Sequence, residues 1–174
     1  IAKDLAAGGG AASASVKGSW KTTDGTQPLT SAIVDSLIAG KMYSNFHTIA
    51  SSGGEIRGQL VLKGGIGFVA SLEGSKENPP TGSNATATGS FLLNGARNQV
   101  SYRVTYIGLA SPLTAGGHIH VGNSARNGSI VRDLAFGGDS ASGTVTGVWK
   151  TTDLTRALTT ALVESLFTAR LYAN

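Results

Sequence analysis

The stretch "QVSYRVTYIGL", Gln99–Leu109, alternates apolar and polar side chains along most of its length. The apolar residues occupy every second position, with polar ones between them: Val100, Tyr102, Val104 and Tyr106 against Ser101, Arg103 and Thr105. Successive side chains of a β-strand point to opposite faces of a sheet, so a period of two predicts a strand with one buried face.

Six other segments have strand-like composition and are bounded by glycine or other turn residues. They are Lys41–Thr48, Gly54–Lys63, Gly65–Gly74, Ala85–Gly95, Gly116–Asn123 and Ser142–Thr151. Turn residues recur at intervals of about 8–12 residues, which is typical of β-sandwiches. We therefore predict an all-β fold, an antiparallel Greek-key sandwich of the immunoglobulin or superoxide-dismutase kind. The residues after His120 are expected to form a loop.

One segment has helical rather than strand periodicity. In "TQPLTSAIVDSLIAG", Thr26–Gly40, the residues Leu29, Ile33 and Leu37 share one helix face. Pro28 near the start and Gly40 at the end suit a helix of about three turns.

This helix belongs to a long internal repeat. The stretch "SWKTTDGTQPLTSAIVDSLIAGKMYSN", 19–45, returns as "VWKTTDLTRALTTALVESLFTARLYAN", 148–174. The alignment extends without a gap back to Ile1 and Ile130, and about half of its 45 positions are identical. Such self-similarity indicates tandem duplication, with one short helix per unit.

The repeat predicts the domain organisation. Residues 1–62 form the later part of a first unit, 63–67 a linker, and 66–174 a second unit. The stretch "HTIASSGGEIRGQL", His47–Leu60, occurs only once, so the second unit lacks its closing strand. We expect residues 46–62 to complete that unit, in the same chain or from another one, unless the segment follows Asn174 in a longer parent.

Composition excludes several classes of protein. Of the 174 residues, 14% are charged, and the net charge of +4 comes from scattered Lys and Arg rather than a basic run. Nucleic acid is therefore not an expected partner. Cysteine is absent, which excludes disulfides, and no apolar run has the length of a membrane span. Two N-glycosylation sequons begin at Asn84 and Asn127 and agree with export.

Four motifs resemble the chordin-type (CHRD) domain family. They are Glu77-Asn78-Pro79-Pro80, His118-Ile119-His120, Tyr43-Ser44-Asn45-Phe46-His47-Thr48 and Gly53-Gly54-Glu55-Ile56-Arg57-Gly58-Gln59. The resemblance covers the chain as two incomplete copies and implies an extracellular or cell-surface β-sandwich. Asn78 stands where the family has an apolar residue. In chordin these domains belong to a growth-factor antagonist, a partner that we do not transfer to this chain.

The three histidines, His47, His118 and His120, all lie in these motifs. In a strand, His118 and His120 point to the same face, and a third imidazole would complete a copper or zinc site similar to that of superoxide dismutase. That enzyme also uses a fourth histidine and an aspartate, so dismutase activity is not expected. The alternative is that these imidazoles only hydrogen-bond between strands.

We therefore weigh three functions, none of them enzymatic. The first is a structural module that assembles with copies of itself into a fibre, matrix or surface layer. Its strand-exchange segment comprises His47, Glu55, Ile56, Arg57, Gln59 and Leu60. The second is metal binding by the histidines, and the third is recognition of an unidentified extracellular protein. Glu55 and Arg57 share a strand face, where an edge or cross-strand ion pair is expected, with Glu77 as one candidate partner.

Overall fold

A computed structural model describes residues 1–5, 13, 15–113, 116–123, 125–135 and 140–174. The chain divides into two compact units, Ile1–Leu62 and Lys63–Asn174.

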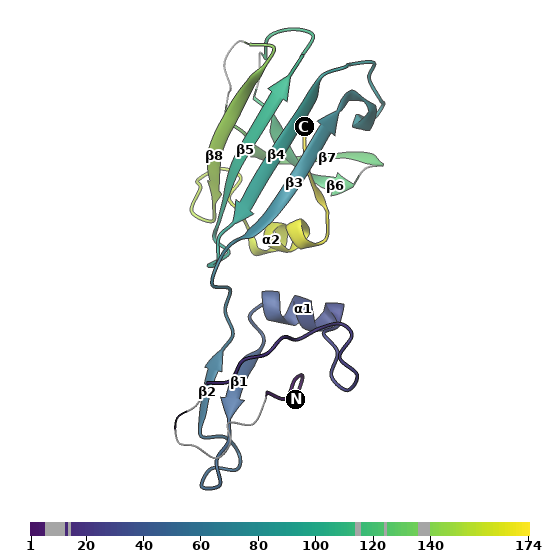
Figure 1. Cartoon of the computed structure of the whole chain (residues 1–174). Helices are drawn as coiled ribbons and strands as arrows, with labels where there is room; N and C mark the ends of the chain where they lie inside the picture. Colours follow the sequence, from purple (N-terminus) through teal and green to yellow (C-terminus); the bar gives the residue numbers. More distant parts are fainter. Residues whose placement is uncertain (6–12, 14, 114–115, 124, 136–139) are drawn as a thin grey trace. The chain divides into compact units, whose positions relative to one another are not determined.

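The first sheet of the second unit has four antiparallel strands in the order β3-β4-β5-β8 (Figure 1). The strands are β3 (Ile66–Glu73), β4 (Thr86–Leu93), β5 (Gln99–Ile107) and β8 (Gly143–Lys150). A one-turn 3-10 helix, Gly74–Lys76, follows β3. The predicted alternation appears directly in β5, where Val100, Tyr102, Val104 and Tyr106 are buried and the residues between them are more exposed.

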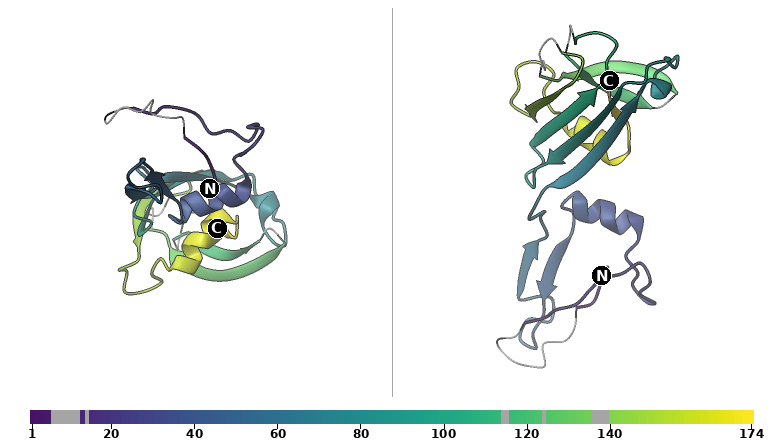
Figure 2. Two further views of the ribbon diagram at one scale, coloured as in Figure 1. Left: turned by 90° about the horizontal axis from the view of Figure 1, so that it is seen from below. Right: turned by 45° about the horizontal axis from the view of Figure 1, so that its top comes forward.

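The second sheet of this unit has the order β7-β6-β9. Its strands are β6 (His118–Asn123), β7 (Arg126–Asp133) and β9 (Leu171–Ala173), and helix α2 (Thr160–Phe167) precedes β9. Figures 1 and 2 show the two sheets in separate layers, with α2 across one end. Apolar residues of both sheets, of α2 and of the loop before α2 form one core, which includes Leu93, Val100, Ile119, Trp149, Leu158 and Val163.

The first unit contains helix α1 (Ser31–Ile38) and the antiparallel pair β1 (Tyr43–Phe46) and β2 (Ile56–Gln59). The Thr30 side chain caps α1 by accepting the Ile33 N–H, and Gly40 follows the helix with φ +66°. None of the residues that the structure describes in this unit is buried. The unit therefore has secondary structure but no closed core.

The structure confirms the predicted all-β sandwich with one short helix in each unit. Two details differ. The helices have eight residues each, so they are shorter than three turns. Leu29 lies outside α1, where its N–H bonds to the Lys21 carbonyl in a turn. The residues after His120 were expected to form a loop, and this was wrong, because 126–133 form strand β7.

Candidate functional site

The two copies of the repeat fold alike. Trp20 Nε1 donates to the Gln27 carbonyl and Trp149 Nε1 to the Arg156 carbonyl, each at 2.7 Å. Ion pairs repeat as well. Lys3 bonds Asp24, and its counterpart Arg132 bonds Asp153, again at 2.7 Å in both copies. Identical sequence positions thus build the same local framework twice.

The environments of the two copies differ. Trp149 is 0% exposed, and Leu158 and Val163 are also buried, whereas their first-unit counterparts Trp20, Leu29 and Val34 are only half-buried. The difference arises because β3, β4, β5 and β6 cover the second copy, while no equivalent strands occur among the described residues of the first unit. The first unit therefore presents core-type side chains without a core.

The two copies also differ in how their last strand is paired. Tyr43 and Asn45 of β1 correspond to Tyr172 and Asn174 at β9. Strand β1 pairs with β2, with Tyr43 opposite Gln59 and Asn45 opposite Arg57. Strand β9 pairs with β6, with Tyr172 opposite His120.

In the described part of the chain, no strand pairs with the side of β9 that faces away from β6. We call this side the open edge of β9. An unpaired strand edge presents free backbone N–H and C=O groups to any strand that can reach it. Strand β1, which is the counterpart of β9 in the first unit, pairs with β2. Strand β2 is therefore the kind of strand that the β9 sequence can accept.

Strand β2 has two distinct faces. Ile56 lies opposite Phe46 and Gly58 opposite Ser44, on the face that corresponds to the core side of β9. Ile56 is 66% exposed, so this apolar face is uncovered. On the other face, Arg57 lies over the Tyr43 ring, with its Cζ 5.6 Å from the ring centroid.

The expected ion pair between Glu55 and Arg57 is not formed. Glu55 instead accepts a hydrogen bond of 2.5 Å from the Thr48 hydroxyl. Gln59 donates to the carbonyls of Gly40 and Met42, and Leu60 continues the pairing with β1 through its N–H. The predicted strand-exchange segment is thus held to its own unit by polar contacts, while its apolar face stays exposed.

The histidines are placed by two different units. His118 and His120 lie on one face of β6, with perpendicular rings whose centroids are 5.8 Å apart. His120 Nδ1 donates to the Gly128 carbonyl at 2.9 Å, and its ring stacks on Tyr172 at 5.0 Å. His118 Nε2 lies 3.7 Å from Asp133.

His47 lies in the first unit, just after β1, where its Nδ1 donates to the Ser52 carbonyl at 2.9 Å. Within the described residues, no group of three or more histidines or acidic side chains is arranged to hold a metal ion. Asp133 is engaged by Arg156 as well as by His118. Each unit thus offers imidazoles, but neither assembles a full ligand set by itself.

The Glu77-Asn78-Pro79-Pro80 motif, which follows the first sheet's strand β3, forms hydrogen bonds with residues in and next to the second sheet. Asn78 Nδ2 donates to the Ala125 carbonyl, and Asn127 Nδ2 donates to the Asn78 carbonyl at 2.8 Å. Glu77 Oε2 accepts a bond of 3.3 Å from Asn174 Nδ2, just beyond β9. The motif therefore places a carboxylate next to Asn174, at the end of β9. Of the two sequons, Asn84 is exposed before β4 and Asn127 lies on β7.

Local charges shift two carboxyl groups. The Lys3 ammonium, followed by the Lys21 backbone N–H, holds the pKa of Asp24 below its ordinary value of 3.8. Hydrogen bonds from Lys76 and then Ser71 lower the pKa of Glu73. Both groups support turns at the surface, and neither is buried.

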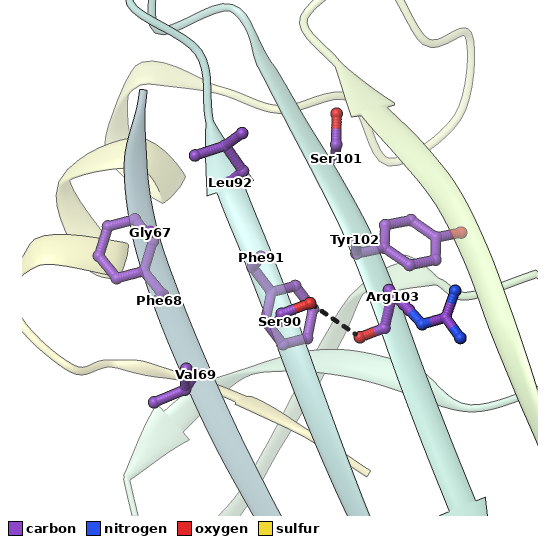
Figure 3. Close-up of a pocket in the computed structure, with 9 residues that line it drawn as sticks. All are labelled: Gly67, Phe68, Val69, Ser90, Phe91, Leu92, Ser101, Tyr102 and Arg103. Carbon is purple, nitrogen blue, oxygen red and sulfur yellow. Dashed lines mark hydrogen bonds between the residues drawn. The ribbon is translucent and has the colours of Figure 1, made fainter. Parts of the chain in front are cut away.

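The outer face of the first sheet bears a shallow depression. Figure 3 shows Val69, Ser90, Leu92, Ser101 and Arg103 around it, from β3, β4 and β5. Arg103 is the one charged side chain among its lining residues. His118 and His120 belong to the other sheet, so the depression and the histidine face are separate surfaces.

Sequence reasoning named the strand-exchange segment but missed its acceptor residues. Tyr172 and Asn174 lie at β9 and were not singled out as part of a site, and Glu77 was named only as a candidate ion-pair partner for the strand that carries Glu55 and Arg57. The signal for the first two was available, because the repeat aligns them with Tyr43 and Asn45. The contact between Glu77 and Asn174 joins residues 97 positions apart and has no sequence signal.

Comparison with known proteins gives one result. The sequence profile of the CHRD domain matches residues 3–60 and 68–174, which is nearly the whole chain. No curated protein and no solved structure matches it. Among the described residues, neither helix is long and apolar enough to cross a membrane. CHRD domains occur in extracellular proteins. The chain belongs to the CHRD domain family and carries two incomplete tandem copies of that domain.

Proposed function

We propose that this chain is a non-enzymatic, extracellular structural module whose CHRD units join by sheet completion. In this proposal, β2 of one copy pairs with the open edge of β9 in another copy. The observation that supports it is the equivalence of β1 and β9, since β1 pairs with β2, whereas no strand among the described residues pairs with the other side of β9. Repetition of this contact joins copies head to tail into an open chain, as in a fibre, matrix or surface layer.

The exchange keeps most of the backbone pairing. Three of the four residues of β2, Gln59, Gly58 and Arg57, find counterparts of their β1 partners at Tyr172, Ala173 and Asn174, whereas Phe46, the partner of Ile56, has no counterpart in the sequence. The gain is apolar burial. Beside β9, Leu60 comes opposite Leu171, and Ile56 lies diagonal to Ala173 on the same face; Leu171 and Ala173 already pack against the core of the second unit. Full burial of an aliphatic side chain stabilises by about 1.5–3 kcal/mol, which offsets part of the entropy lost on association.

Sedimentation velocity across a hundredfold dilution tests this proposal with two matched variants. Ile56→Glu places a charge on the face that must become buried, whereas Ile49→Glu changes a residue that is 105% exposed in the loop before β2. We expect the unaltered chain and Ile49→Glu to associate and Ile56→Glu to remain a 17.6 kDa monomer. A monomer in all three cases, or equal association of all three, overturns the proposal.

A metal site is a second candidate, favoured by the hydrogen bonding of two imidazoles. A carbonyl oxygen only accepts, so His120 and His47 each carry the proton on Nδ1, and their Nε2 has the lone pair that a metal ligand needs. Metal-binding histidines are held in this manner by backbone carbonyls. We propose that His118 and His120 supply two ligands for copper or zinc, with His47 of a second copy as the third. Recognition of another extracellular protein has no comparable supporting contact.

A further inference from the structure

We propose that Arg57 of a second copy is the residue that sets the register at the open edge of β9, by covering the Tyr172 ring and pairing with Glu77. This inference rests on the proposed sheet completion and adds the specific contacts that select the partner. It follows from three observations on the two units.

The first observation is the arrangement of Arg57 in its own unit. Arg57 stands opposite Asn45, and its guanidinium lies over the ring of Tyr43 on the neighbouring strand. The repeat makes Asn174 the counterpart of Asn45, and Tyr172 the counterpart of Tyr43. A β2 strand that pairs with β9 as it pairs with β1 therefore brings Arg57 opposite Asn174 and over the ring of Tyr172.

The second observation is that the Tyr172 ring is fixed and ready for this contact. His120 stacks on the ring at an interplanar angle of 13°, and the Tyr172 hydroxyl accepts the Gly128 N–H at 2.8 Å. His120 approaches from β6, on one side of β9, whereas an added strand lies on the opposite side. The guanidinium then reaches the other ring face, where cations are attracted to tyrosine.

The third observation is complementary charge. Glu77 is held next to Asn174, the residue that follows β9, by the hydrogen bond from the Asn174 side chain, and it forms no ion pair with any basic side chain that the structure describes. Arg57 likewise forms no ion pair in the described part of the first unit. Because Arg57 of the added strand stands opposite Asn174, its charge arrives next to the Glu77 carboxylate. A planar guanidinium suits both a ring face and a carboxylate.

A charge-exchange cycle tests the inference by sedimentation velocity. Glu77→Arg alone and Arg57→Glu alone each place like charges together, and each is expected to weaken self-association roughly tenfold. The double variant restores opposite charges in reversed order, so its association returns to within about threefold of the unaltered chain. Glu164→Arg, on the exposed face of α2, is the control. It changes the net charge by the same amount as Glu77→Arg and is expected to leave association unchanged.

An equal mixture of the two single variants also associates, because each strand then meets an edge of opposite charge. Far-UV circular dichroism verifies that all variants retain the fold. If the unaltered chain associates but both single reversals have no effect, or the double variant fails to recover, the register is wrong while sheet completion stands. A chain that is monomeric throughout overturns sheet completion and this inference together.

Discussion

Replacing each tryptophan by alanine compares how much the side chain stabilises each copy of the repeat. Trp149→Ala empties a position that is 0% exposed in the core of the second unit, and buried Trp→Ala replacements cost about 3–5 kcal/mol. Trp20 is half-buried, and no buried residue surrounds it in the described part of the first unit. Both variants lose the same indole hydrogen bond, which contributes about 0.5–1.5 kcal/mol.

The difference between the two variants therefore isolates core packing. We expect Trp149→Ala to lower the free energy of unfolding of the second unit by at least about 2 kcal/mol more than Trp20→Ala lowers that of the first unit. Hydrogen exchange of β5 amides reads the second unit alone, and exchange of β1 and β2 amides reads the first. Equal losses in the two units would refute the reasoning, because they would mean that Trp20 lies in a closed core as well.

Two further predictions concern titration and metal binding. Asp24 has a lowered pKa in the folded state, so its contact with Lys3 stabilises the first unit above about pH 3.8 and is lost as the pH falls through the folded-state pKa. An NMR titration of its carboxyl carbon should give a higher pKa in Lys3→Ala than in the unaltered chain, because the hydrogen bond from Lys3 is then lost while the one from the Lys21 N–H remains. Zn²⁺ or Cu²⁺ titrated into the chain by calorimetry should bind, and His118→Ala should abolish binding; absence of heat with the unaltered chain rejects the metal site.

The sandwich could be predicted because its strands carry a clear period. The alternation from Val100 to Tyr106 matches the burial of β5 position by position. The helix was predicted too long because Leu29 continues the apolar stripe but belongs to a turn that bonds Lys21. Leu158 and Lys150 make the same turn in the second copy, so the error applies to both units.

Strand β7 escaped prediction for a physical reason. Its pairing with β6 has register shifts between Ile119 and His120 and between Val121 and Asn123, which break the period of two. Gly128, which reads as a turn residue, is required inside the strand, because an added Cβ there would collide with the Val121 carbonyl. Irregular pairing thus hid a strand that carries the Gly128 acceptor of His120.

The site was predictable only in part. The strand-exchange segment could be named because it occurs once in a chain that otherwise repeats. The strand edge that would accept this segment could not be predicted from the sequence. It is defined by the pairing of β9 with β6 and by the contact of Glu77 with Asn174, and both depend on how distant segments pack. The sequence repeat already assigns His47 to the first unit and His118 and His120 to the second, so the predicted triad requires a folded-back segment 46–62 or a second copy; these residues lie in the two units in that way.

Disulfide trapping between copies tests sheet completion most directly, because the chain has no cysteine of its own. Ser44 stands opposite Gly58 in the first unit, and Ala173 is the counterpart of Ser44. Under oxidation, an Ala173→Cys copy mixed with a Gly58→Cys copy should form a covalent dimer, since directly opposed strand residues lie within disulfide reach. Ala173→Cys mixed with Val61→Cys, an exposed position beyond β2, should not. Equal yields in the two mixtures, or no dimer in either, would contradict the account.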